Sequence, residues 1–70
     1  MTTDNILRTD SERTSFRALR TTALALGDAV LARMCDLAIE TSLNRAMGLR
    51  APNGGPAAFQ RCKSLTERAF

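Results

Sequence analysis

The chain has 70 residues, a net charge of +3, two cysteines and no histidine. This length allows one domain at most. Two thiols without an imidazole do not make a zinc site, and a disulfide framework needs four or more cysteines. The first residues, MTTDNILRTDSER, lack the apolar stretch of a signal peptide, so we expect a cytoplasmic protein with free thiols, no metal and no cofactor.

Alanine, leucine and arginine dominate the composition, and β-branched residues are few. Alanine, leucine and arginine are strong helix formers, so we expect an all-α protein. Residues 1–8 are predicted to be loose. The stretch Thr9-Asp10-Ser11-Glu12 matches a capping box and predicts the start of a helix, with Asp4 as the rival cap if the helix begins earlier.

The central run TTALALGDAVLARM, residues 21–34, is the most apolar in the chain. It is too interrupted by Asp28 and Arg33 to predict a membrane span. Gly27-Asp28 is either a helix stop followed by an N-cap or a tolerated glycine inside one helix. Apolar residues keep a spacing of 3 or 4 across the pair, which favours one long helix over 9–48. They are Phe16, Leu19, Ala23, Leu26, Val30, Met34 and Leu37.

The long helix is predicted to end at Gly48, which suits a left-handed C-terminal position. Residues 49–56 have the composition of a turn, and Pro56 suits the first turn of a short helix over 57–69. The predicted architecture is therefore a helical hairpin with one long and one short helix.

A second apolar stripe lies in the C-terminal part of the long helix, and the short helix is predicted to pack on it. Its members are Cys35, Ile39, Leu43, Ala46 and Met47. On this arrangement Cys35 and Cys62 lie at different heights, too far apart for a disulfide. The first stripe, from Phe16 to Leu37, would stay exposed, so we expect a homodimer that pairs along it.

Arg13, Arg17 and Arg20 follow i, i+4, i+7 spacing and line one face near the start of the long helix. Leu24 and Leu31 continue this face. Together they form a candidate binding site for an acidic protein surface, since aliphatic residues beside arginines are common in interfaces. The alternatives are a solvated arginine face and leucines buried at the edge of the dimer.

The sequence contains no phosphate loop, nucleophile elbow or paired carboxylates, so we expect no enzyme. A protein-binding module that acts by occluding its target is the favoured class. A small basic DNA-binding regulatory dimer is the alternative. The pI of about 9.7 and the arginine row favour it, but Lys63 is the only lysine.

The stretch RTSFRALRTTALALGDAVLARM and the short second helix complete a compact, basic layout. In length, composition and layout over nearly the whole chain, it resembles the small early proteins of Pseudomonas temperate phages of the quorum-sensing anti-activator type. The resemblance implies a phage-encoded helical dimer that binds a LuxR-type regulator and blocks its binding to DNA. It also implies inhibition of the ATPase that assembles type IV pili. It assigns no role to single residues.

Overall fold

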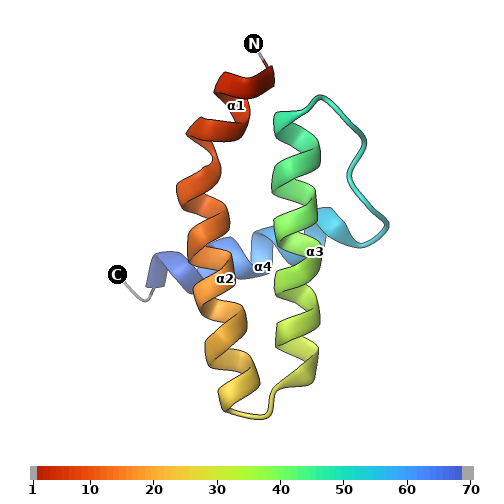
Figure 1. The fold of residues 1–70 in the computed structure, drawn as a ribbon. Coiled ribbons are helices and arrows are strands. Elements are labelled where there is room, and N and C mark those ends of the chain that lie inside the picture. Colours follow the sequence, from red (N-terminus) through yellow and green to blue (C-terminus); the bar gives the residue numbers. More distant parts are fainter. Residues whose placement is uncertain (1, 69–70) are drawn as a thin grey trace.

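The computed structural model describes residues 2–68, and their regular elements are four helices (Figure 1). They are α1 (Thr2–Arg8), α2 (Asp10–Ala25), α3 (Ala29–Ala46) and α4 (Gly55–Arg68). Helices α2 and α3 lie side by side and antiparallel, and α4 crosses both on one side of the pair. The predicted all-α class is confirmed. Among the described residues, no helix is both long and apolar enough to cross a membrane.

The predicted single helix over 9–48 is wrong, because the chain reverses direction at Gly27. Gly27 has a φ of 75° and donates its N–H to Leu24 O, while the Asp28 N–H bonds Ala23 O at 2.8 Å. This pair of bonds is a Schellman motif, which satisfies carbonyls at the end of α2. Asp28 is then the N-cap of α3, since its carboxylate accepts from Leu31 N at 3.0 Å.

The hairpin is favoured over the rod because both local signals and tertiary packing support it. Glycine inside a helix costs about 1 kcal/mol relative to alanine, whereas in the turn it takes a conformation it adopts readily. An aspartate N-cap contributes about 1 kcal/mol more. The regular apolar spacing across Gly27 does not distinguish one long helix from two shorter ones. Each of two packed helices must also turn an apolar face to the shared core.

Residues 2–8 form α1, although the sequence analysis predicted a loose segment over 1–8, of which residue 1 lies outside the described part. Helix α1 also uses the side chain that was predicted to cap α2. Thr9 makes no side-chain cap bond to α2, because its hydroxyl donates to Asn5 O at 2.9 Å at the end of α1. The capping-box prediction at Thr9 is therefore wrong.

Helix α3 ends at Ala46, two residues before the predicted end at Gly48. Gly48 has a φ of 74° and completes a second Schellman pattern, with Leu49 N–H bonded to Asn44 O at 2.7 Å. Residues 47–54 connect α3 to α4, whereas the sequence predicted a turn over 49–56. Helix α4 begins at Gly55, two residues before the predicted short helix, whose last residue lies outside the described part. A Cβ at Gly55 would collide with Thr41 Oγ1 and lie 2.9 Å from the Pro52 ring, so this contact needs glycine.

The core forms where α4 crosses the hairpin. Its buried members come from three helices and are Phe16, Cys35, Ala38, Phe59 and Cys62. The Phe16 and Phe59 rings pack edge to face with centroids 5.6 Å apart. The Arg45 guanidinium lies over the Phe59 ring at 4.5 Å, a cation–π contact that closes this core from solvent.

The two cysteines meet inside this core, contrary to the prediction that they lie too far apart. Cys35 Sγ and Cys62 Sγ are 3.8 Å apart, and both residues are fully buried free thiols. The prediction assumed that α4 runs antiparallel along the long helix. Because α4 instead crosses α3, helical rise does not set the separation of the two residues.

Candidate protein-binding face

The first predicted binding residue, Arg13, is not on the surface. It is 4% exposed, and its guanidinium donates to Ser42 Oγ at 3.2 Å, to Thr9 Oγ1 and to Ile6 O. Ser42 Oγ in turn donates to Glu12 Oε2, whose other oxygen pairs with Lys63 Nζ at 3.0 Å. Arg13 is therefore part of a buried polar network that joins all four helices, and its assignment to partner binding is wrong.

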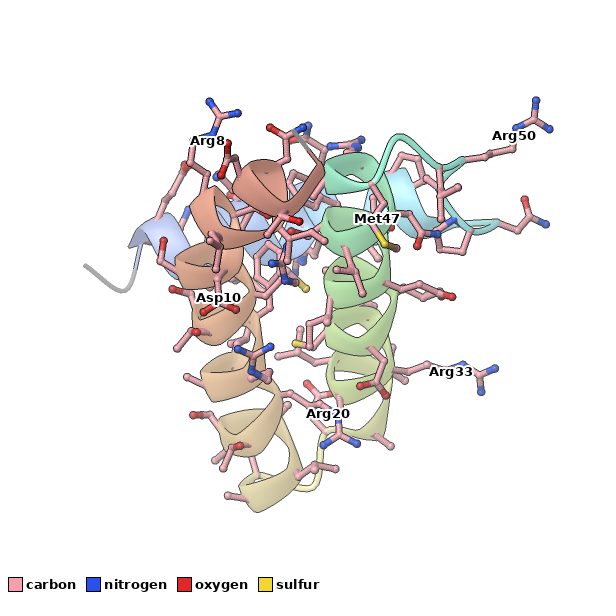
Figure 2. The ribbon with its side chains drawn as sticks, turned by 45° about the horizontal axis from the view of Figure 1, so that its top comes forward. Arg8, Asp10, Arg20, Arg33, Met47 and Arg50 are labelled. Carbon is pink, nitrogen blue, oxygen red and sulfur yellow. The ribbon has the colours of Figure 1, made fainter. Side chains whose placement is uncertain are left out.

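Arg17 and Arg20 remain on the surface, each beside an acid. Arg17 Nη2 lies 3.7 Å from Asp10 Oδ1, and Arg20 Nε bonds Asp36 Oδ1 at 2.6 Å. Figure 2 shows Arg20 in front of the space between α2 and α3, on the side away from α4. The three arginines thus do not form one free cationic row, because one is buried and each of the other two is paired with an acid.

The predicted dimer stripe is divided between the core and the surface. Phe16 and Ala23 are 0% exposed, so contacts within the chain already cover them and they are not free to form a dimer interface. Leu19, Met34 and Leu37 are half-buried. The stripe fails as one interface because its residues belong to two antiparallel helices whose inner faces pack on each other.

Among the described residues, five large hydrophobic side chains are the most exposed, and three of them lie next to the Gly27 turn. Leu26 is 77% exposed, Val30 73% and Leu24 52%. The other two, Leu7 and Leu49, lie singly on α1 and on the loop after α3. Exposed apolar residues that cluster are more informative than single ones, which are normal on protein surfaces.

Leu24 and Leu31 were predicted to share one face of a single helix. They lie on different helices, and Leu31 is half-buried against the core cluster while Leu24 is exposed. The turn at Gly27 separates them, so the predicted pair of leucines beside the arginine row is not formed. Leu24 follows Arg17 and Arg20 by seven and four residues, which leaves it on the side of the hairpin away from α4.

On α2, the side that faces α4 is defined by Glu12, which pairs with Lys63 of α4. Leu19 and Leu26 follow Glu12 by seven and fourteen residues, so they lie on the same side of the helix. Helix α4 crosses α2 near Phe16, as the contact with Phe59 shows. The two leucines therefore continue the surface on which α4 packs, beyond the place where α4 covers it.

On α3, the side that faces α4 is defined by Arg45, which lies over Phe59, and by Thr41, next to Gly55. Val30 and Met34 precede Thr41 by eleven and seven residues and so share its side. Leu31 and Met34 pack against the core cluster with their outer parts still in solvent.

Both helices thus carry apolar residues past α4, toward the turn. We call this surface the free-end face. It consists of Leu19, Leu26, Val30, Leu31 and Met34. Four of the five belong to the predicted dimer stripe and the fifth, Leu31, to the predicted partner-binding set.

The border of the free-end face includes residues of α4 that the sequence analysis did not single out as a site. Lys63 points toward the N-terminal half of α2, where it reaches Glu12. Arg61 and Leu65 are two residues to either side of Lys63, about 200° around the helix, so they lie on the flank toward the Gly27 turn. Arg68 follows Arg61 by seven residues and shares that flank. The position of these residues at the border follows from the way α4 crosses the hairpin. Helical periodicity alone does not give that crossing.

Two open depressions lie elsewhere on the described part of the chain. One, of about 460 Å³, lies between α2 and α4 and is lined by Glu12 and Lys63, which already pair with each other, and by three hydroxyl groups and Glu67. The other, of about 530 Å³, lies beside Arg8 and Arg45. Within residues 2–68 no group of three or more Cys, Asp or Glu side chains is placed to hold a metal ion.

The buried thiols are not arranged as nucleophiles. Burial raises the pKa of Cys35 above its ordinary value of 9.0, and burial beside Cys35 raises the pKa of Cys62 to about 12. The thiolate is the reactive form of cysteine, so both side chains stay protonated and unreactive at neutral pH in the folded protein.

Comparison of the chain with protein-family models, with curated proteins and with solved structures finds no match.

Proposed function

We propose that this is a non-enzymatic protein-binding protein, and that it binds its target through the free-end face. One observation carries the proposal: the apolar surface on which α4 packs continues beyond α4 to Leu26 and Val30, which are 77% and 73% exposed. Burying one such side chain contributes roughly 1.5–3 kcal/mol. A partner that covers both would gain several kcal/mol without any change in the fold.

The resemblance to phage anti-activators extends this proposal to a target. On that basis the protein is phage-encoded, acts in the bacterial cytoplasm, and occludes a LuxR-type quorum-sensing activator, with the type IV pilus assembly ATPase as a second target. The mechanism is stoichiometric: bound protein blocks the surface that the activator needs for DNA.

The sequence analysis also expects a homodimer, and in this fold the free-end face is the surface on which it would form. The argument from a long uncovered rod no longer supports it, because the core is closed within one chain. Sedimentation equilibrium at micromolar concentration checks the oligomeric state directly.

The test of the proposed function uses a LuxR-type activator and labelled operator DNA. Added wild-type protein is expected to release the DNA, whereas Val30→Glu is expected to lose this effect. Ala57→Glu is the matched control, because Ala57 is exposed on α4 and lies outside the free-end face. Release by all three proteins, or by none, would contradict the proposal for this target.

A small DNA-binding regulator remains a second candidate function, and one observation favours it. Six arginines balance six acids in residues 1–48, so the whole net charge of +3 lies in residues 49–70. Gln60, Arg61, Ser64 and Arg68 are all exposed on α4. Affinity for duplex DNA that falls steeply with salt, and that Arg61→Glu reduces, would support this class.

A further inference from the structure

We propose that the partner element bound by the free-end face is an acidic amphipathic helix that lies alongside α4. This inference rests on the proposed protein-binding function and adds the shape and charge of the partner. Its first support is that the hairpin already binds one helix in this way: α4 crosses α2 and α3 on the same side (Figure 1).

The free surface has the size of one helix. From Leu19 to Leu26 the rise along α2 is about 10 Å, at about 1.5 Å per residue. Packed helices have axes about 8–10 Å apart. The uncovered part of the hairpin therefore accommodates one further helix next to α4, with Leu65 of α4 on the near border and the Gly27 turn on the far border.

The partner helix needs an apolar stripe, because the surface it meets has two apolar rows. Leu19 and Leu26 form the row on α2, and Val30, Leu31 and Met34 form the row on α3. A helix with apolar residues at i, i+3, i+4 and i+7 presents a stripe of matching width to such a surface.

The charges around the free-end face favour an acidic partner. Arg61 and Arg68 lie on the flank of α4 that borders it, and Arg33 follows Val30 by three residues on α3. Figure 2 shows Arg33 projecting away from the hairpin. None of these three arginines forms an ion pair with another residue of the described chain. Asp28, at the Gly27 turn, accepts a hydrogen bond as the N-cap of α3, and Asp36 pairs with Arg20.

The same charges disfavour a second copy as the occupant. A two-fold interface uses one patch on both subunits, so the free-end faces would meet and bring both sets of Arg33, Arg61 and Arg68 into one interface. Like charges that face each other in an interface oppose association. An acidic helix removes this repulsion and pairs with the arginines instead.

The test uses two labelled synthetic helical peptides, each of about 18 residues so that the helix is stable enough to form. Both carry leucine at the stripe positions; one has glutamate at the flanking positions and the other has lysine there. Fluorescence anisotropy measures binding to the full-length protein. The glutamate peptide is expected to bind at least roughly tenfold more tightly than the lysine peptide, since charges bordering an interface set partner choice.

Charge-reversal variants locate the contact. Arg61→Glu combined with Arg68→Glu is expected to weaken the glutamate peptide by roughly tenfold or more and to strengthen the lysine peptide. Arg8→Glu combined with Arg50→Glu is the matched control, because it changes the net charge equally at the opposite end of the molecule (Figure 2). The control pair is expected to leave the preference unchanged. Val30→Glu is expected to abolish binding of both peptides.

Other outcomes overturn the proposal in distinguishable ways. Equal affinity for both peptides, lost in Val30→Glu, removes the acidic preference while the apolar binding face stands. If neither peptide binds, and the NMR signals of Leu26 and Val30 stay unchanged, the proposed function falls as well. A dimer that Val30→Glu dissociates identifies a second copy as the occupant. Binding of duplex DNA that needs Arg61 but not Val30 identifies a nucleic-acid surface instead.

Discussion

The two ends of the α2–α3 hairpin are built in different ways. From its middle toward α1 the hairpin is covered: α4 crosses the pair (Figure 1), the Phe16 and Phe59 rings pack together, and Arg13 is buried in a polar network. At the Gly27 end the same side of the hairpin carries exposed Leu26 and Val30. A chain this short buries only about 60% of the surface it exposes when unfolded. It concentrates its stabilising contacts at one end and leaves apolar surface at the other.

Arg13→Ala is expected to have the largest effect on stability, because it disrupts the covered end. Hydrogen bonds to a charged group contribute about 1.5–3 kcal/mol, so we expect a loss of about 2–3 kcal/mol in the free energy of unfolding. Urea denaturation measures it. Arg17→Ala is the control from the same helix and should change stability by less than about 0.5 kcal/mol, since its ion pair is exposed. Equal losses for the two variants would show that Arg13 is not buried in the network.

Alkaline pH is expected to weaken the core through Cys62. Its pKa is about 12 in the folded protein, above the ordinary 9.0. As the pH rises past 9, the unfolded chain loses its proton first, so stability is unaffected below about 9 and falls between 9 and 12. By pH 10.5 the loss is on the order of 2 kcal/mol.

The measurement compares wild type with Cys62→Ala at pH 7.5 and pH 10.5. The difference in unfolding free energy between the two proteins should shrink at the higher pH, because only the wild type loses this contribution. A difference that stays constant would mean that the thiol is accessible to water.

Gly27→Ala distinguishes a turn from a helix interior by the sign of its effect. A Cβ at Gly27 meets no atom within 4 Å, so only the backbone conformation matters. With a φ of 75°, alanine is expected to cost about 1–2 kcal/mol. Inside a continuous helix the same substitution would instead stabilise by about 1 kcal/mol. Chemical denaturation of the two proteins gives the sign.

Val30→Glu is expected to have the smallest effect on stability, within about 0.5 kcal/mol, because the side chain is exposed and an acid suits the first turn of a helix. Thermal unfolding followed by circular dichroism measures it. A large loss would show that the free-end face is covered within the chain, which would remove the surface proposed for binding.

The sequence predicts the helical class and the position of α4, because both depend on composition and on local signals such as Gly48 and Pro56. It also contains the turn signal Gly27-Asp28, but the apolar spacing of 3 or 4 across that pair fits one continuous helix equally well. The crossing of α4 over the hairpin is not encoded in any local pattern. For that reason the contact of Cys35 with Cys62, the burial of Arg13 and the border of the free-end face escaped prediction.

The structure differs most directly from a single continuous helix over 9–48 in the contact between Phe16 and Cys35, which lies within one chain in the structure. In a continuous helix these residues are about 28 Å apart, at about 1.5 Å per residue, so contact between them requires two chains. In the structure both belong to one core cluster. Isotope-filtered NOE spectra of a mixture of labelled and unlabelled chains separate the two cases. A contact within one chain is predicted, and a contact found only between chains would contradict the hairpin and the free-end face deduced from it.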